Sequence, residues 1–339
     1  MSGASKLATF VTPSGPRVGL IQGESISPLS GARSMEEVIS TYDCKTSLTA
    51  LQEDAVPLSS VKLLPPIHPA RNIICVGKNY LEHVKEVDTH LPGISKEAAP
   101  SAPIIFTKAP HSAIGHQEPI LYPTGISEQV DYEGELAVVI GKEGRGISRD
   151  TALEHVFGYT ILNDVTARDL QKKHQQWFLG KSQDTFCPMG PWIVLARDFP
   201  LHDGPRIQTL VNGQIRQDDT TSNMIFDVAE LIATISAGVS LHPGDIIATG
   251  TPAGVGAGLQ PPCFLQPGDT VTIRIEGLSD PKHEASKQVP SRFPMGIVRS
   301  SETLPPPATK QHTPVHHPLQ LEEWVGGKKK GRTEMERCS

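Results

Sequence analysis

The hydrophobic positions along the chain predict more strands than helices. In the N-terminal part, apolar stretches at 7–11 and 18–22 flank a Pro-Ser-Gly-Pro turn at 13–16, which predicts a β-hairpin. Residues 35–51 are expected to form a short helix, and a cluster of prolines follows it. We therefore expect a small N-terminal β-rich domain over residues 1–69.

Residues 70–279 are expected to form a second, larger domain in which strands and helices do not alternate. This irregular order argues against a doubly wound or (β/α)₈ fold and favours a mixed sheet bent into a roll or sandwich. The expected fold class is mixed α/β, mainly β. Strands are predicted at 73–76, 104–107, 135–140, 157–162, 192–196, 207–211, 245–249 and 270–275, and helices at 80–87, 167–175 and 226–237.

The C-terminal part, residues 280–339, has a different composition and no hydrophobic periodicity. It contains eight of the 30 prolines and a lysine triplet at 328–330. We predict a disordered tail, because such a composition cannot sustain a packed core. Solvated charge is the ordinary interpretation of the triplet, and a targeting or anion-binding patch is the alternative.

Charge and cysteine content narrow the class of protein. The formal net charge of −6 gives no reason to expect nucleic acid as a partner, and no apolar run approaches the ~20 residues of a membrane span. The five cysteines are scattered without CxxC spacing, which favours reduced thiols over a disulfide framework. The N-terminus lacks the pattern of a signal peptide. The cytoplasm is the expected compartment, with the mitochondrion as the alternative.

Three carboxylates alternate along the stretch 131–135. In a strand, Asp131, Glu133 and Glu135 would share one face, because successive side chains point to opposite sides. Their mutual repulsion inside a sheet is costly, and a divalent cation removes that cost. Oxygen ligands favour Mg²⁺, Mn²⁺ or Ca²⁺ over Zn²⁺. A solvent-facing acidic strand edge is the alternative interpretation.

Two further positions carry possible chemistry. Asp164 follows a predicted strand and precedes a predicted helix, so it is either a helix N-cap or a third metal ligand that projects into a cleft. His83 and Glu86 are three residues apart on a predicted helix and can meet on one face. Either they form a surface pair, or Glu86 orients His83 as a general base.

Five motifs, in this order along residues 5–279, resemble the fumarylacetoacetate hydrolase family. The stretch 184–191 is similar to the branch named fumarylacetoacetate hydrolase domain-containing protein 2. The motifs are Val76-Gly77-Lys78-Asn79-Tyr80 with His83 and Glu86, Asp131-Tyr132-Glu133-x-Glu135-Leu136, Asp164-Val165-Thr166-Ala167-Arg168-Asp169-x-Gln171, Gly180-Lys181-Ser182, and Gly250-Thr251-Pro252-x-Gly254-Val255-Gly256.

The resemblance implies a mixed β-sandwich roll that usually forms a homodimer. It implies Mg²⁺ or Mn²⁺, with Ca²⁺ as the alternative, held by Glu133, Glu135 and Asp164. The implied catalytic residues are His83, Glu86 and Lys181, and the implied substrate-binding residues are Gln171, Thr251, Gly250 and Tyr132. Among other residues, Arg168 is expected to pair with Asp131, and Trp177 and Trp192 to lie in the core.

The sequence also departs from the family. Ala109 follows Lys108, where the family usually has a proline. His116 follows Gly115, where the family usually has a proline after the glycine. After residues 275–278 the family normally closes its sheet with a strand, whereas this chain runs into the proline-rich tail. We therefore expect the closing strand to be missing, which would leave an open sheet edge.

The expected activity is that of a divalent-metal-dependent enzyme that acts on a small 1,3-dicarbonyl or keto acid through a metal-bound enolate. Hydrolysis of a C–C bond in an acylpyruvate is the first interpretation, and it requires a water activated by His83 and Glu86. Tautomerisation or decarboxylation of oxaloacetate is the second, and it requires only the metal and a proton shuttle. A non-catalytic metal-binding scaffold is the third.

Overall fold

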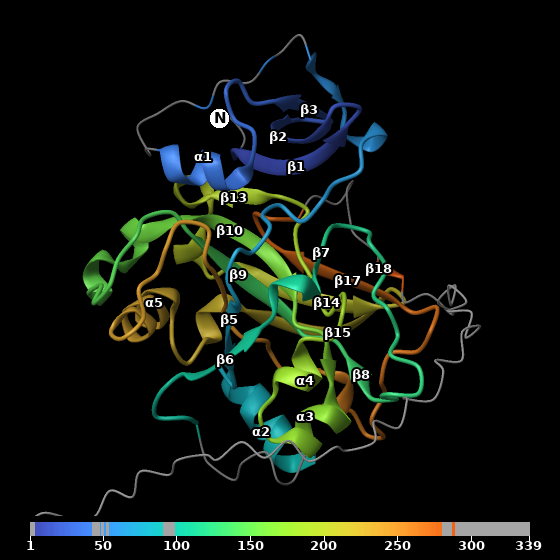
Figure 1. Ribbon diagram of the computed structural model, residues 1–339. Helices are drawn as coiled ribbons and strands as arrows, with labels where there is room; N and C mark the ends of the chain where they lie inside the picture. The colour runs from blue at the N-terminus through green and yellow to red at the C-terminus, as the bar shows by residue number, and fades with distance from the viewer. Residues whose placement is uncertain are drawn as a thin grey trace, which may run out of the picture. The chain divides into compact units, whose positions relative to one another are not determined.

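Ten strands form one mixed sheet (Figure 1). This computed structural model describes residues 4–42, 48, 51, 54–90, 99–279 and 287–288, without the side chains of 87–90 and 287–288. The strands of the large sheet are β1 (Lys6–Thr12), β2 (Gly15–Gln22), β3 (Ser25–Pro28), β4 (Val56–Pro57), β5 (Ile73–Gly77), β6 (Ile104–Lys108), β9 (Gly134–Ile140), β10 (Val156–Asn163), β13 (Ile193–Leu195) and β16 (Ile246–Ala248). Their order is β4-β3-β2-β1-β13-β10-β9-β16-β5-β6, and only the β16–β5 pair is parallel.

Smaller sheets complete the strand-rich architecture. β14 (Arg206–Val211), β15 (Gln214–Thr220), β17 (Thr270–Ile275) and β18 (Lys287–Gln288) form a four-stranded sheet in the order β15-β14-β17-β18. Two short pairs are β8 (Val130–Asp131) with β11 (Thr166–Ala167), and β7 (Ala113–Ile114) with β12 (Cys187–Pro188). The expected mixed, mainly β fold class is confirmed.

The N-terminal strands belong to the large sheet. β1 and β2 form the predicted antiparallel hairpin. β1 then pairs with β13, with Leu7 opposite Ile193, so the N-terminal strands continue the sheet that carries β9 and β10. All described residues belong to one compact unit, and the domain division at residue 69 stays a prediction.

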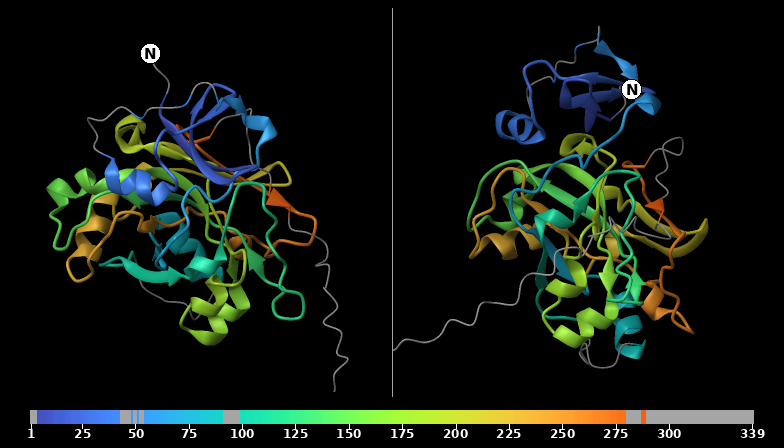
Figure 2. Two further views of the ribbon diagram at one scale, coloured as in Figure 1. Left: turned by 45° about the horizontal axis from the view of Figure 1, so that its top comes forward. Right: turned by 45° about the vertical axis from the view of Figure 1, so that its right-hand side comes forward.

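The described helices are short. They are α1 (Met35–Thr41), α2 (Leu81–His90), α3 (Arg168–His174), α4 (Phe178–Lys181) and α5 (Val228–Ser236), with 3₁₀ turns at Leu58–Ser60, Pro110–Ser112, Arg149–His155, Ala196–Asp198, Leu201–Asp203, Thr221–Asn223 and Gly256–Gly258. None of them has the length and apolar character needed to cross a membrane. α2, α3 and α4 gather at one end of the large sheet (Figures 1 and 2).

The first helix is shorter than the sequence predicts. α1 begins after Ser34, whose side chain accepts a hydrogen bond from the Glu37 amide, and it ends at Thr41 instead of Leu51. Tyr42 has an extended backbone, and the Leu51 amide donates to the Pro28 carbonyl at the end of β3. Residues 43–47 and 49–50 lie outside the described part.

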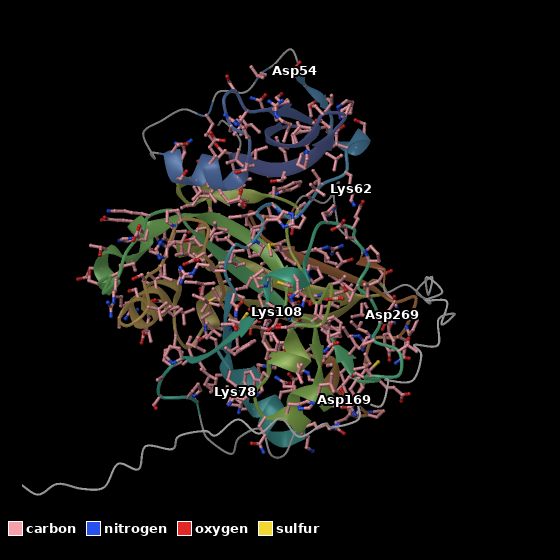
Figure 3. All side chains as sticks on the ribbon, in the orientation of Figure 1. Asp54, Lys62, Lys78, Lys108, Asp169 and Asp269 are labelled. Carbon is pink, nitrogen blue, oxygen red and sulfur yellow. The ribbon has the colours of Figure 1, made fainter. Side chains whose placement is uncertain are left out.

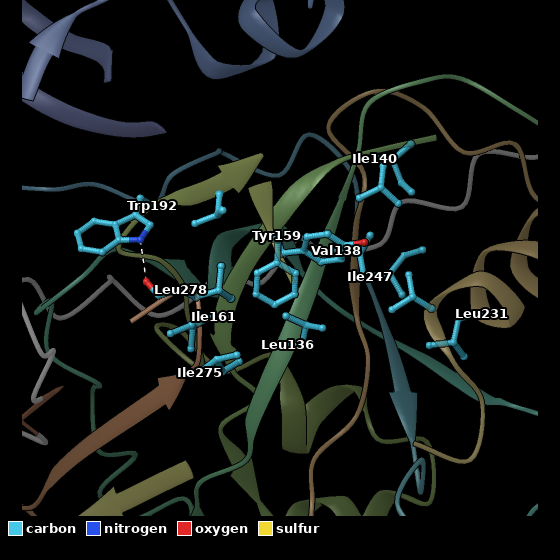
Figure 4. Packing of buried hydrophobic residues seen from close by; sticks show 14 of the residues in the cluster. Leu136, Val138, Ile140, Tyr159, Ile161, Trp192, Leu231, Ile247, Ile275 and Leu278 are labelled. Atoms are coloured by element: carbon cyan, nitrogen blue, oxygen red, sulfur yellow. Dashed lines mark hydrogen bonds between the residues drawn. The ribbon is translucent and has the colours of Figure 1, made fainter. Parts of the chain in front are cut away.

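The central strands β9 and β10 are buried along their whole length. Leu136, Val138 and Ile140 of β9 pack in one apolar cluster, while Ala137 and Val139 pack in another on the opposite face. A strand that is covered on both faces has a nearly continuous run of apolar residues in its sequence, and β9 has such a run. Figure 4 shows the first cluster, which includes Trp192, whose indole N–H donates to the Leu278 carbonyl over 2.8 Å. Trp192 is thus a core residue, as expected.

The C-terminal end corrects the expectation of a missing closing strand. β18 pairs antiparallel with β17, with Gln288 opposite Thr270 and Lys287 opposite Val271. Its two residues are polar, so the hydrophobic pattern gives no sign of them. The remainder of the predicted tail, residues 280–286 and 289–339, lies outside the described residues.

Candidate active site

Three carboxylates meet where β9 begins and β10 ends. Glu135 is the second residue of β9 and pairs with Leu162 of β10, so Glu133 and Asp164 lie next to each other at the same end of the two strands. The Asp164 amide donates to the Glu133 carbonyl over 2.8 Å. All three side chains are buried, and one oxygen from each lies within 4.8 Å of the others.

Asp131 is directed to a different set of partners. The strand expected to run through residues 131–135 is broken at Tyr132 and Glu133, between β8 and β9. Asp131 accepts hydrogen bonds from the amides of Gly256 (2.7 Å) and Ala257 (3.0 Å). It also accepts one from Arg168 Nε (2.9 Å), which is the expected ion pair. Its carboxylate anchors the loop at 256–257, and it does not belong to the carboxylate cluster.

The cluster fits a hard divalent cation. Its three donors are carboxylates, and Mg²⁺, Mn²⁺ and Ca²⁺ prefer oxygen ligands. Burial, followed by repulsion from Asp164 and Glu133, raises the pKa of Glu135 well above its ordinary value. A cation bound to Glu133, Glu135 and Asp164 would relieve this repulsion, and three protein ligands leave coordination positions for substrate or water.

Lys181 reaches two of the three carboxylates. Its ammonium donates to Glu133 Oε2 and Asp164 Oδ2, each over 2.7 Å. Burial opposes its charge, but Asp164 and Glu133 outweigh burial and raise the pKa of Lys181. Burial also disfavours charge on Glu133, yet Lys181 and Arg168 outweigh it and lower the pKa of Glu133 to about 2. Lys181 therefore enters the pocket as a cation held by the cluster.

Lys108, at the end of β6, is a site residue that the sequence analysis did not single out (Figure 3). Its side chain is fully buried, and its ammonium donates to Asp164 Oδ1 (2.6 Å), the Val165 carbonyl (3.0 Å) and the Lys181 carbonyl. All three of its N–H groups are thus used. Lys108 balances the charge of Asp164 and links Asp164 to Lys181 at the end of α4. The position of Lys108 at the end of a predicted strand does not reveal this role.

His83 and Glu86 lie on α2, as predicted, and contact each other. His83 Nδ1 is 3.2 Å from Glu86 Oε2. The Glu86 carboxylate also accepts from the Gly254 amide over 3.0 and 3.1 Å. Gly258 makes room for it, since a Cβ there would lie 2.1 Å from Glu86 Cδ. Glu86 therefore has a fixed position from which it can orient the His83 ring.

A pocket opens beside the carboxylate cluster. Val76, Phe106 and Trp177 form its apolar part, and the Phe106 and Trp177 rings meet edge-on with centroids 5.0 Å apart. Trp177 is half-buried, which corrects the expectation that it lies in the core: it packs against Gly77, where a Cβ would approach the ring to 2.7 Å. The polar lining residues are Lys78, His83, Glu133, Glu135, Arg168, Gln171, Lys181 and Thr251.

Of the four residues implied for substrate binding, two line the pocket and two support its surroundings. Gln171 and Thr251 line the pocket. Gly250 donates its amide to Glu135 Oε2 over 2.8 Å, so it supports the carboxylate cluster. Tyr132 packs in an apolar cluster with Val130 and donates to the Gly254 carbonyl over 2.8 Å.

Gln217 of β15 fixes the Thr251 hydroxyl. That hydroxyl donates to the Gly134 carbonyl (2.9 Å) and accepts from Gln217 Nε2 (2.7 Å). The Gln217 amide oxygen in turn accepts from the Gly134 amide (3.0 Å). The single hydroxyl proton of Thr251 is therefore already used within the protein. Gln217 was missed because the sequence of β15 is polar.

Comparisons with known proteins show relatives of this chain over the part that contains the site. The family model described as fumarylacetoacetate (FAA) hydrolase C-terminal matches residues 72–284, which include every member of the carboxylate cluster. The oxaloacetate tautomerase YisK of Bacillus subtilis (strain 168) is 51% identical over 220 residues, which cover 65% of this chain and 71% of that protein.

Solved structures show the same fold. A fumarylacetoacetate hydrolase from Exiguobacterium antarcticum has a TM-score of 0.73 and 42% identity, over 85% of this chain and all of that chain. A 2-hydroxyhepta-2,4-diene-1,7-dioate isomerase from Mycobacterium marinum has a TM-score of 0.68 and 35% identity, over 85% of this chain and 98% of that one. The narrower branch inferred from residues 184–191 stays a prediction.

Proposed function

This chain belongs to the fumarylacetoacetate hydrolase family, and from that premise we propose that it is a divalent-metal-dependent tautomerase that interconverts the keto and enol forms of oxaloacetate. The observation that carries the proposal is the 51% identity to an enzyme named oxaloacetate tautomerase. The buried cluster of Glu133, Glu135 and Asp164 beside a pocket supports it. Hydrolysis of an acylpyruvate, which the sequence favoured, has less support than this alternative.

Tautomerisation needs one proton to move. The C3–H bond of the keto form breaks, an O–H bond forms at the C2 oxygen, and no water is consumed. His83 lines the pocket with Nδ1 directed to Glu86, so Nε2 is the atom that can take or return the C3 proton. Glu86 fixes the ring and stabilises the imidazolium that forms.

Positively charged groups can stabilise the negative charge that develops on the C2 oxygen of the substrate. The Lys181 ammonium lines the pocket and can donate a hydrogen bond to the C2 oxygen while it remains attached to the carboxylate cluster. A divalent cation held by Glu133, Glu135 and Asp164 would supply Lewis-acid stabilisation of the enolate charge. The apolar side of the pocket limits the access of water, which strengthens these interactions.

Hydrolysis of a C–C bond is the second candidate. The contact between His83 and Glu86 also fits a base that activates water, and one of the similar structures is named a fumarylacetoacetate hydrolase. This reaction differs from tautomerisation because it consumes water and releases two products. The two activities can therefore be separated by product analysis.

The proposal is tested with purified protein and Mg²⁺ or Mn²⁺ on two substrates, against a metal-only control. With oxaloacetate, the enol absorbance should relax to equilibrium faster than in the control. With acetylpyruvate, little pyruvate should form. His83→Ala should slow the enol relaxation by about 10²–10⁴-fold while Mn²⁺ affinity stays unchanged. Rapid release of pyruvate from acetylpyruvate without faster enol relaxation would favour hydrolysis instead.

A further inference from the structure

Trp177 has the largest side chain in the pocket wall, and it stands immediately before α4. Its carbonyl accepts a hydrogen bond from the Lys181 amide over 3.0 Å, so the two residues lie one helical turn apart. Side chains with this separation lie on the same side of a helix, and both of these line the pocket. The Trp177 indole therefore borders the part of the pocket that receives the Lys181 ammonium.

The Phe106 ring contacts both Trp177 and Lys181, because α4 packs against β6 (Figure 1). The centroid of the Phe106 ring lies 5.0 Å from the Trp177 centroid and 5.0 Å from Lys181 Nζ. The same ammonium is 2.7 Å from Glu133 and 2.7 Å from Asp164. The apolar wall of the pocket thus begins directly beside the carboxylate cluster, where the C2 oxygen of the substrate is expected to bind.

The backbone of β5 prevents the Trp177 ring from moving back from the pocket. The ring packs against Gly77, where a Cβ would lie 2.7 Å from Trp177 Cζ3 and 3.0 Å from Cη2. The edge-on contact with Phe106 holds the ring on a second side. Trp177 is only half-buried, so its ring forms the outer part of the wall. A substrate group that extends from the carboxylate cluster toward solvent therefore has to pass this ring.

The pocket beside the ring is narrow. Its free volume is about 30 Å³, whereas pockets for drug-sized ligands have roughly 300 Å³ or more. Packed side chains in such a wall do not yield without cost. The pocket therefore favours a small substrate over one that carries a large acyl or aryl group.

We infer that Trp177 is a specificity-determining residue that restricts the pocket to 2-keto acids with a small group at C3. This inference rests on the proposed function and deepens it, because it names the substrate class. With the C2 oxygen at Lys181, the group attached to C3 lies along the Trp177 ring. A carboxylate, as in oxaloacetate, is small enough for this place, whereas an aromatic ring collides with the indole.

The test compares two substrates that tautomerise by the same proton transfer, oxaloacetate and phenylpyruvate, of which only the second has an aromatic ring at C3. Trp177→Ala should raise the ratio of kcat/KM for phenylpyruvate to kcat/KM for oxaloacetate by about 10–100-fold, because it removes the ring that excludes the phenyl group. The enol absorbance of each substrate measures both rates. Trp177→Leu should raise the ratio less, and it carries the test where Trp177→Ala unfolds more readily than the wild type.

Phe178→Ala is the matched control for an aromatic ring removed from the same turn. Phe178 follows Trp177, is 46% exposed, and is not among the described residues that line the pocket. Its loss should leave the ratio of the two kcat/KM values unchanged. An unchanged ratio in both Trp177 variants, or an equal rise in Phe178→Ala, would overturn the inference.

A binding measurement separates this inference from the proposed function. Calorimetry with Mn²⁺-loaded protein compares lactate and 3-phenyllactate, two unreactive 2-hydroxy acids that differ by a phenyl group at C3. Trp177→Ala should bind 3-phenyllactate about 10–100-fold more tightly than the wild type does, and this result does not require turnover. An affinity for 3-phenyllactate that is no higher in Trp177→Ala than in the wild type would refute the role of Trp177. Failure of the wild type to accelerate enol relaxation would refute only the proposed function.

Discussion

Glu133 and Glu135 are two residues apart, yet their surroundings shift their pKa values in opposite directions. Burial opposes ionisation of both carboxyl groups. At Glu133, the attraction of Lys181 and Arg168 outweighs burial and lowers the pKa to about 2. At Glu135, repulsion from Asp164 and Glu133 adds to burial and raises the pKa. Neighbouring charges, more than sequence position, therefore decide the direction in which each pKa shifts in the metal-free protein.

Metal binding should release a proton from Glu135. Its pKa is higher in the folded, metal-free protein than in an unfolded chain, so the stability linked to this proton is present at low pH and is lost as pH rises through the folded pKa. A metal ligand must be ionised, so Mn²⁺ affinity should rise with pH over the same range. Calorimetry in buffers with different ionisation enthalpies measures the number of protons released. A heat of binding that is independent of the buffer would contradict the assignment.

Lys108→Met should destabilise the metal-free protein by about 3–5 kcal/mol, because it leaves the Asp164 carboxylate buried without one of its cations. The free energy of unfolding in urea measures this cost. Lys62→Met is the control: Lys62 is 59% exposed and pairs with Glu118 over 2.7 Å, so its loss should cost at most about 1 kcal/mol. Similar costs for the two variants would show that Lys108 does not stabilise the carboxylate cluster.

At the scale of single elements, the pairing of β9 with β10 assembles the carboxylate cluster. The sequence predicts both strands because each is a continuous apolar run, and it places Asp164 at a strand end. It does not reveal the break at Tyr132 and Glu133, which separates Asp131 from the cluster. The Asp131 side chain instead accepts a hydrogen bond from the Gly256 amide, far along the chain, and a local pattern does not reveal such a contact.

The elements that the sequence misses are polar or short. β15 lies at the edge of its sheet, and Gln217 is its only fully buried residue, so it has no alternating apolar pattern to find. α4 has only four residues, although its last residue is Lys181. Local patterns thus identify the elements with apolar faces, whereas Lys108 and Gln217 join the site through contacts between distant segments.

The close packing of α2 against the 3₁₀ turn at Gly256–Gly258 can be tested by a substitution that adds one methyl group to the turn. Gly258→Ala places a Cβ about 2 Å from Glu86 Cδ, so Glu86 must move away from its contact with His83. We expect a lower kcat for oxaloacetate and unchanged Mn²⁺ affinity, since the carboxylate cluster is not touched. Gly238→Ala is the control, because no atom lies within 4 Å of a Cβ there. A Gly258→Ala enzyme with the kcat of the control would contradict the orienting role of Glu86.

At the scale of the whole molecule, the catalytic fold extends beyond Ser279. β18 pairs with β17, so residues 287–288 add a strand to the four-stranded sheet. A chain that ends at Pro294 should keep the turnover and stability of the full chain. A chain that ends at Ser279 loses this pairing and should be less stable by about 1–2 kcal/mol. Unfolding in urea and enol relaxation measure both effects. Loss of turnover in the chain that ends at Pro294 would assign a catalytic role to the segment beyond it.

The most direct test of the account is to strip the protein of metal and titrate Mn²⁺ back while following the enol absorbance of oxaloacetate, with subtraction of the rate from Mn²⁺ alone. The account predicts no enzymatic acceleration in the stripped protein and recovery that saturates at one Mn²⁺ per chain. Glu135→Gln should neither bind Mn²⁺ in calorimetry nor regain activity, because it removes one of three ligands. Full activity in the stripped protein, or unchanged Mn²⁺ affinity in Glu135→Gln, would contradict it.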